Sequence, residues 1–180
     1  MNRSMSTIAD NKTFSKDIHA DCYIIRPMRE SDNEQIAHLI RCVIDEHGAS
    51  RTNSVYDDPQ TDNVFKSFLN INAEYWVIDH NHKIVGGCGF FPTNGLPEKC
   101  AEIVKFYLMP TVRGKGLGAQ IFDFVTDRAS HAGYNRLYLE TVPLFSRAVD
   151  MYKERGFDFL SAPIGNTGHS APSIFMSKWL

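Results

Sequence analysis

The segment LMPTVRGKGLGAQIF, from Leu108 to Phe122, decides how the rest of this sequence is interpreted. Its glycines, Gly114, Gly116 and Gly118, stand among cations, after a strand-like run and before residues with helical spacing. Glycine lets consecutive backbone N–H groups face one anion, and the N-terminus of the following helix adds positive potential. The segment is therefore either a phosphate-binding loop or a glycine-rich turn without a ligand.

The spacing of the glycines separates three known phosphate loops. The P-loop pattern fails because Lys115 is followed by Gly116, where that pattern needs a hydroxyl residue. The dinucleotide pattern G-x-G-x-x-G fails by one residue, although Glu140 closes the next strand about where that fold places its ribose-binding acid. The pattern R-x-x-G-x-G fits Arg113, Gly116 and Gly118. This fit favours a pyrophosphate site, and a nicotinamide or flavin enzyme that uses Glu140 stays a minor alternative.

The segments around the loop predict an α/β domain of mixed α+β type. Ser31 with Glu34 three residues later is a capping box that predicts the start of a helix. The turn DHNHK between aromatic and β-branched runs predicts a hairpin. The unit from Ala101 to Thr141 reads strand, loop, helix, strand and predicts a parallel crossover. The full predicted order is strand, two helices, three strands, helix, strand, helix and two strands.

Composition limits the class of protein and its partners. A chain of 180 residues with 43% hydrophobic residues is typical of one packed domain. A net charge of −2 predicts no general attraction for nucleic acid or for an anionic membrane. Residues 1–20 hold no continuous apolar core, which predicts a flexible N-terminal extension rather than a signal or a membrane span. Residues 21–180 are then a single domain.

The four cysteines, Cys22, Cys42, Cys88 and Cys100, are scattered along the chain. They form no C-x-x-C pair and have no histidine at the spacing of a tetrahedral zinc site. We expect reduced thiols in a cytoplasmic protein, and no metal.

Two motifs resemble the GNAT superfamily of acetyl-CoA-dependent N-acetyltransferases. The stretch AEIVKFYLMPTVRGKGLGAQIFDFV looks like the strand, pyrophosphate loop and helix of that family, and RAVDMYKERGF looks like its A-x-x-x-Y-x-x-x-G-F helix. The motifs occur in the family's order, with the strand RLYLETV between them. The resemblance implies a GNAT-like acyl-CoA N-acyltransferase fold, with a mostly antiparallel mixed sheet of about seven strands flanked by four helices.

The resemblance also implies the chemistry, which is transfer of acetyl from acetyl-CoA to a primary amine by direct attack in a ternary complex. Glu102 matches the family's base on the strand before the loop, and Tyr152 matches its acid in the last helix. From the residues alone, Glu102 could equally be a solvated strand-end carboxylate or a partner for Lys105. Tyr152 could be a core tyrosine, because Val149 and Phe145 share its predicted face.

Cofactor contacts follow from the same resemblance. Leu108 and Met109 match strand positions whose backbone pairs with pantetheine, and the Leu108 N–H would also stabilise the oxyanion. Ala148 of the second motif is assigned to the cofactor site as well. One departure is Phe145, which stands where many members have an asparagine that bonds to the cofactor. The backbone amides assigned to the pyrophosphate are those of Arg113, Gly114, Lys115, Gly116, Leu117 and Gly118.

The acceptor is not named by the sequence. We expect the first two helices and their loop to form its site, where acidic residues would attract a cationic amine or simply form a solvated surface. A small-molecule amine and a protein amine both fit, and a homodimer is common among proteins of this kind. A catalytically silent acyl-CoA sensor or interaction module of the same fold is the alternative function. The acidic residues are Asp45, Glu46, Asp57, Asp58 and Asp62.

Overall fold

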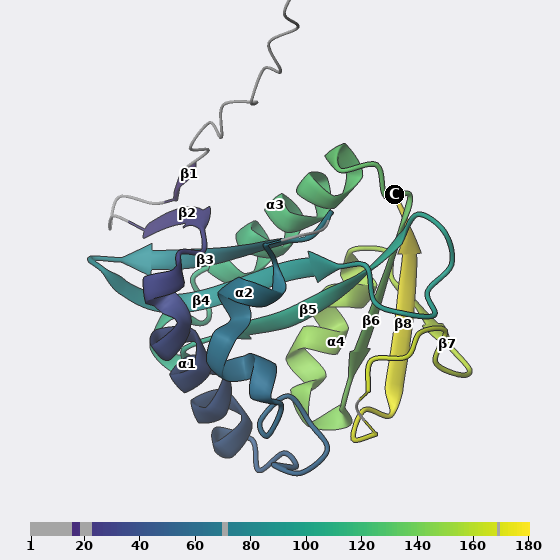
Figure 1. Ribbon diagram of the computed structural model, residues 1–180, viewed down its shortest axis with the longest axis horizontal. Helices are drawn as coiled ribbons and strands as arrows, with labels where there is room; N and C mark the ends of the chain where they lie inside the picture. Colours follow the sequence, from purple (N-terminus) through teal and green to yellow (C-terminus); the bar gives the residue numbers. More distant parts are fainter. Residues whose placement is uncertain (1–15, 19–22, 70–71, 169) are drawn as a thin grey trace, which may run out of the picture.

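The computed structural model describes residues 16–18, 23–69, 72–168 and 170–180 (Figure 1). Cys22 and most of the predicted N-terminal extension, residues 1–15 and 19–20, lie outside the described residues. In the described part of the chain, no helix has both the length and the apolar character needed to cross a membrane.

One mixed sheet organises the described chain, in the strand order β1-β2-β3-β4-β5-β6-β8-β7. All neighbouring strands are antiparallel except β5 and β6, which form the predicted parallel pair. The sheet has one strand more than expected, because Lys16–Ile18 of the predicted extension forms β1 and pairs with β2. The other strands are β2 (Tyr23–Pro27), β3 (Glu74–His80), β4 (Lys83–Phe91), β5 (Cys100–Leu108), β6 (Arg136–Thr141), β7 (Asp158–Leu160) and β8 (Ile174–Trp179).

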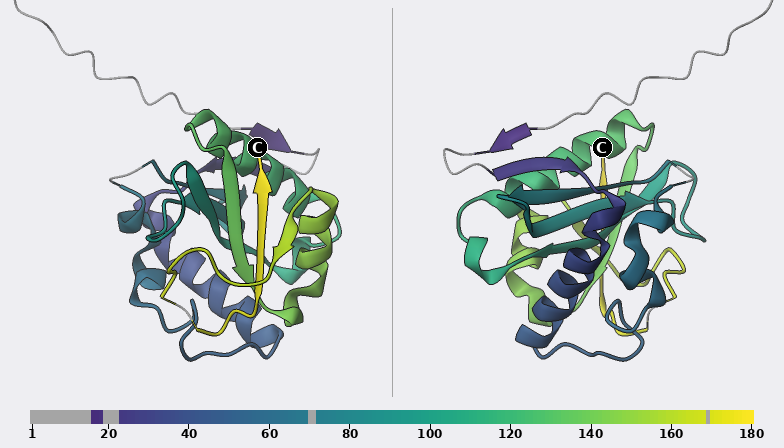
Figure 2. Two further views of the ribbon diagram at one scale, coloured as in Figure 1. Left: turned by 90° about the vertical axis from the view of Figure 1, so that its right-hand side faces the viewer. Right: turned by 60° about the vertical axis from the view of Figure 1, so that its left-hand side comes forward.

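Helices cover both faces of the sheet (Figures 1 and 2). On one face lie α1 (Asn33–Glu46) and α2 (Val64–Ser67), the latter preceded by the 3₁₀ turn η2 (Pro59–Asn63). On the other lie α3 (Leu117–His131) and α4 (Ser146–Glu154). The predicted mixed and mostly antiparallel sheet flanked by helices is confirmed.

Two apolar clusters hold these layers together, as the helical spacing predicts. Ile121 and Val125 of α3 are fully buried against Ile103 of β5. Ile36 and Ile40 of α1 are fully buried in the cluster on the opposite face. Burying each such side chain contributes about 1.5–3 kcal/mol, so the amphipathic helices are held mainly by their apolar faces.

The start of α1 differs from the prediction. Ser31 lies in a 3₁₀ turn, and the side chain that accepts the Arg29 N–H is Asp32, at 2.7 Å. The Asp32 carboxylate also accepts hydrogen bonds from both terminal nitrogens of Arg26, at 2.7 and 3.0 Å. The Arg26 Nε donates to Asp79 of β3 at 2.9 Å. Because these charges are largely buried, they must be paired. An ion network that joins Asp32 to strands β2 and β3 therefore sets the helix start, in place of the predicted capping box of Ser31 and Glu34.

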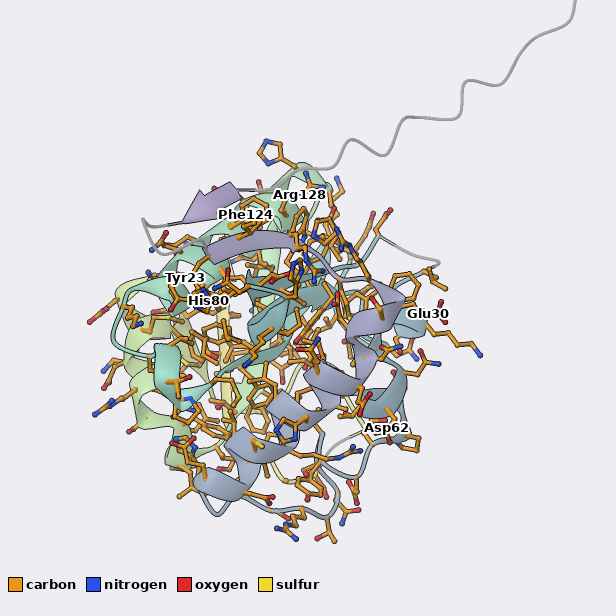
Figure 3. The ribbon with its side chains drawn as sticks, turned by 90° about the vertical axis from the view of Figure 1, so that its left-hand side faces the viewer. Tyr23, Glu30, Asp62, His80, Phe124 and Arg128 are labelled. Carbon is orange, nitrogen blue, oxygen red and sulfur yellow. The ribbon has the colours of Figure 1, made fainter. Side chains whose placement is uncertain are left out.

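The predicted hairpin between β3 and β4 is confirmed. Asn81 and His82 form its two-residue turn, both with positive φ, at 51° and 65°. Two such residues give the type I′ turn that suits the twist of a hairpin. At the same end of the sheet the rings of Tyr23 and His80 stack, with centroids 4.3 Å apart. Figure 3 labels these two neighbouring residues.

The feature that positions the site is the divergence of β5 and β6. The parallel pairing covers only Cys100 to Glu102 on β5, while β5 stays paired with β4 as far as Leu108. The two strands diverge in Figure 1, where β6 runs steeply down the view and β5 crosses it. Beyond Glu102, one side of β5 is therefore left without a partner strand.

Candidate active site

A cavity of about 1390 Å³ lies at this divergence. Its walls come from the end of α1, the loop with η2, strand β5, the glycine loop, the end of β6 and α4. Met109, Lys115 and Leu117 are predicted site residues that do not line it. Those that line it are Glu102, Leu108, Arg113, Gly114, Gly116, Gly118, Ala148 and Tyr152.

The glycine loop presents a row of unused backbone donors. Gly114 and Gly116 have φ of 76° and 77°, which is the left-handed region that favours glycine. The Arg113 N–H, which was also assigned to the pyrophosphate, donates to the Pro110 carbonyl at 3.3 Å. Among the described residues, none accepts a hydrogen bond from the N–H groups of residues 114–119, and the Gln120 N–H donates to the Gly116 carbonyl. These N–H groups stand at the N-terminus of a 15-residue helix. The arrangement suits a phosphate or pyrophosphate anion.

The cationic side chains of the loop face elsewhere. The Arg113 guanidinium donates to the Leu108 carbonyl at 2.9 and 3.0 Å and to both carboxylate oxygens of Glu46 at 2.8 and 2.9 Å. The Lys115 ammonium donates to the Tyr23 hydroxyl at 3.2 Å. Leu117 is buried and anchors the first turn of α3 in the core. An anion at this loop would therefore meet backbone N–H groups rather than the side chains of Arg113 or Lys115.

Leu108 and Met109 differ in the use of their backbone groups. The Met109 N–H donates to Val85 at 2.8 Å, and its carbonyl accepts the Val112 N–H at 3.1 Å. Because bonding directions alternate along an antiparallel strand, the Leu108 N–H points away from β4 and into the gap toward β6. The backbone pairing predicted for both residues therefore has an available donor at Leu108 only.

Glu102 is a nearly buried carboxyl at the point of divergence. The Thr93 hydroxyl donates to it at 2.5 Å, and the side chain lines the cavity. Burial, with a smaller contribution from the negative charge of Glu140, raises the pKa of Glu102 to about 7. A carboxyl group with this pKa accepts and releases protons near neutral pH, as a general base must.

Tyr152 combines the two roles that the sequence left open. Its ring packs against Phe122 and Phe157, with centroids 5.2 and 6.0 Å apart, so it belongs to the core. The residue also lines the cavity, and in the described part of the chain no group forms a hydrogen bond with its hydroxyl. Burial raises the pKa of this phenol, so it keeps its proton at neutral pH and can donate it.

Phe145 fills the asparagine position with an aromatic contact. Its ring lies 4.9 Å from that of His47, the residue just after α1, and 6.3 Å from that of Tyr107 of β5, measured between centroids. Ala148, one turn further along α4, lines the cavity and is partly buried. The contact through Phe145 therefore ties the start of α4 to the opposite wall of the cavity.

The predicted acidic cluster is divided by the structure. Asp45 and Asp62 lie outside the cavity and pair with arginines at 2.7 and 2.6 Å, and Asp57 accepts two backbone N–H groups. Only Glu46 and Asp58 line the cavity. The described residues contain no group of three or more side chains that could hold a metal ion.

Sequence reasoning missed Thr93 in the cavity wall and named Lys105 only as a possible partner of Glu102. Thr93 lies in the loop between β4 and β5, and Lys105 lies at an irregularity of β5. Neither position carries a sequence signal, because each depends on how β5 pairs with β4.

Comparison with known proteins identifies the family of this chain. Residues 36–157 match the model of the acetyltransferase (GNAT) family. The chain is 31% identical over 158 residues to YjgM, an uncharacterized N-acetyltransferase of Escherichia coli (strain K12), covering 87% of this chain and 95% of that protein.

Two solved structures share the fold. An acetyltransferase of the GNAT family from Staphylococcus aureus Mu50 has a TM-score of 0.76 at 20% identity, covering 88% of this chain and 99% of that one. A GNAT superfamily phosphinothricin acetyltransferase from Sinorhizobium meliloti, in complex with AcCoA, has a TM-score of 0.69 at 18% identity, covering 87% of both chains. The family match and the YjgM relative show that this chain belongs to the GNAT acetyltransferase family and is an acyltransferase enzyme.

Proposed function

We propose that the enzyme transfers acetyl from acetyl-CoA to a primary amine by direct attack in a ternary complex. The observation that carries the proposal is the continuity of the cavity. It runs from the unused N–H groups of the glycine loop, past Leu108 and Tyr152, to Glu102. One elongated donor and one amine fit such a path, with the reacting atoms where β5 and β6 diverge.

The donor is bound mainly by backbone groups. The N–H groups of residues 114–119 hold the pyrophosphate, and the Leu108 N–H pairs with the pantetheine arm. The S. meliloti enzyme, which shares the fold and is in complex with AcCoA, supports acetyl-CoA as the donor.

The amine is activated by Glu102. An alkylammonium near pKa 10 is no nucleophile, so a proton must leave before or during attack. Glu102, with a pKa of about 7, takes that proton directly or through water. The amine nitrogen then forms a C–N bond with the thioester carbonyl carbon, whose developing oxyanion the Leu108 N–H stabilises. The C–S bond breaks, and the CoA thiolate takes the Tyr152 hydroxyl proton. The second proton that the nitrogen loses passes through water to the Tyr152 oxygen, so that one proton in all, the one on Glu102, is released to solvent.

The test is a thiol-release assay with acetyl-CoA and a panel of amines, run beside calorimetric titrations with acetyl-CoA and with NAD. We expect binding of acetyl-CoA in the micromolar range, about −8 kcal/mol, no binding of NAD, and thiol release with at least one amine. Binding of acetyl-CoA without thiol release for any amine would instead favour the acyl-CoA sensor. No binding of acetyl-CoA would overturn the assignment of the glycine loop.

We also propose that the enzyme acts in the cytoplasm. Cys42, Cys88 and Cys100 are free thiols, which fits a reducing compartment. Fractionation of cells followed by detection of the protein tests this location.

A further inference from the structure

An extra residue in β5 turns Lys105 into the cavity. Between the register pairs Gly87↔Tyr107 and Gly89↔Val104, β4 holds one residue and β5 holds two. This is a β-bulge, and Lys105 takes the positive φ of 49° within it. The bulge shifts the side-chain alternation of β5 by one position at Lys105.

The shift places Lys105 on the same face as Glu102. Ala101 and Ile103 point toward the α3 side of the sheet, where they belong to the apolar core. Without the bulge Lys105 would follow them, because side chains alternate along a strand. Instead it reaches η2 on the α1 side, at Asp58 and Thr61, and lines the cavity together with Glu102.

The partners of Lys105 inside the protein are distant for so buried a charge. The side chain is only 11% exposed. Its ammonium forms a long ion pair with the Asp58 carboxylate, at 3.8 Å, and lies 3.3 Å from the Thr61 hydroxyl. An ammonium has three donors, and a buried one is stabilised by close contact with an anion. Lys105 is therefore a cavity cation whose contacts leave room for a closer anion.

Of the other charged groups of this wall, Arg147 is an exposed residue of α4, and the rest are engaged or serve the amine. Arg113 is held by Glu46 and by the Leu108 carbonyl, so it is not available to an acceptor. Glu140 of β6 accepts from Tyr138 at 2.7 Å and from Thr167 at 3.0 Å. Glu102 and Lys105 remain as a carboxylate and an ammonium three residues apart on one face of one strand.

We propose that Lys105 binds a carboxylate of the acceptor, so that the acceptor is an amino acid or a similar amine with a carboxylate close to its amino group. This inference rests on the proposed function, because Glu102 is taken as the group that receives the amine. Asp58 and Thr61 hold the ammonium in place, and the acceptor carboxylate supplies the close ionic contact. The rings of Phe68 and Phe91, 5.5 Å apart, line the same cavity and give an apolar wall for an acceptor side chain.

The first experiment measures thiol release with amino acids and with the carboxamide of each, which differ in the carboxylate alone. We expect the wild-type kcat/KM to be about tenfold or more higher for the amino acid. Lys105→Met should lower the ratio of kcat/KM for the amino acid to that for its carboxamide to about one, through KM for the amino acid, and Lys105→Arg should retain the ratio. Lys66→Met, an exposed lysine of α2 outside the cavity, is the matched control and should behave as wild type.

Equal or faster acetylation of amines that lack a carboxylate would overturn the role of Lys105 and leave the proposed function intact. Equal losses for both acceptors in Lys105→Met, with the protein folded, would also overturn it, because a merely structural lysine behaves in that way.

The second experiment does not depend on turnover. N-acetyl amino acids and N-acetyl amino acid amides are titrated calorimetrically into the protein saturated with CoA. Tighter binding of the acids, lost in Lys105→Met, supports the inference even if no amine releases thiol and the catalytic proposal fails. Equal binding of acids and amides, or binding of neither, overturns it.

Discussion

Glu102 owes its chemistry to its position at the point where β5 leaves β6. Burial raises its pKa to about 7, so at pH 6 most molecules carry a neutral carboxyl there that cannot accept a proton. We predict that kcat/KM rises with pH with an apparent pKa of about 7. Glu102→Gln should lose this rise of kcat/KM with pH, and its kcat should be lower by about 10²- to 10⁴-fold. A pH-rate profile of the two proteins checks the prediction; an unchanged profile in Glu102→Gln would exclude Glu102 as the base.

Thr93 offers a finer test of the same group. Its hydroxyl donates to Glu102 and lowers the pKa against the effect of burial. The other charges that act on Glu102 are Glu140, which raises the pKa, and Lys105, which lowers it. Thr93→Val should move the acid limb of kcat/KM to higher pH, and Thr93→Ser should restore it. No movement of the limb would mean that Thr93 does not position Glu102.

The same carboxyl makes stability depend on pH. Between pH 4.5, the ordinary pKa of a glutamate, and about 7, the folded state binds more protons at Glu102 than the unfolded state. The free energy of unfolding therefore falls as pH rises through this window, by up to about 3 kcal/mol. Urea unfolding at pH 5 and pH 8 should show a smaller fall for Glu102→Gln than for wild type. Equal falls would mean that Glu102 has an ordinary pKa in the folded protein.

Tyr152 is tested by removing one atom. Tyr152→Phe keeps the ring contacts with Phe122 and Phe157 and removes only the hydroxyl. We predict that kcat falls by about ten- to a thousandfold while acetyl-CoA affinity stays the same. Steady-state kinetics beside calorimetry separates the two quantities, and an unchanged kcat would leave Tyr152 as a core residue only.

Among the elements, the junction of the glycine loop with α3 is the one that we propose binds the donor. Gly116 has a φ of 77° in the loop, and Gly133 has a φ of 94° just beyond the other end of the same helix. Valine at either position strains the backbone by about 1–3 kcal/mol. Only Gly116→Val should weaken acetyl-CoA binding in calorimetric titrations, because only Gly116 belongs to the row of N–H donors. Equal affinities in both variants would refute the pyrophosphate assignment.

The order of the elements could be predicted from the sequence because it rests on local signals. Helical spacing in α3, the turn at Asn81 and His82, and the glycine loop are each set by neighbours along the chain. The prediction that Ser31 caps α1 was wrong because the start of α1 is set by a contact between Asp32 and Arg26, which lies on β2. The bulge at Lys105 depends on pairing with β4, which no local pattern encodes. Glu102 and Tyr152 could thus be proposed from the sequence through the family resemblance. The position of Lys105 in the cavity could not.

At the scale of the whole molecule, donor binding should raise thermal stability. A ligand that binds only the folded state stabilises it by about 2.7 kcal/mol at a hundred times its Kd. For a chain of 180 residues, this corresponds to a rise in Tm of about 5–10 °C. Thermal scans with acetyl-CoA should show that shift, whereas NAD should give none. A shift with NAD alone would favour the nucleotide enzyme that uses Glu140.

The incomplete pairing of β5 with β6 also governs which amides exchange with solvent deuterium. The Met109 N–H is bonded to β4 and should be protected, while the Leu108 N–H, one residue away, faces the open gap and should exchange quickly. An acetyl donor lying along that edge would slow exchange at Leu108 and leave Met109 as it was. The donor would then pair with β5 as a further strand would. Hydrogen–deuterium exchange would detect its binding as new protection of the Leu108 N–H.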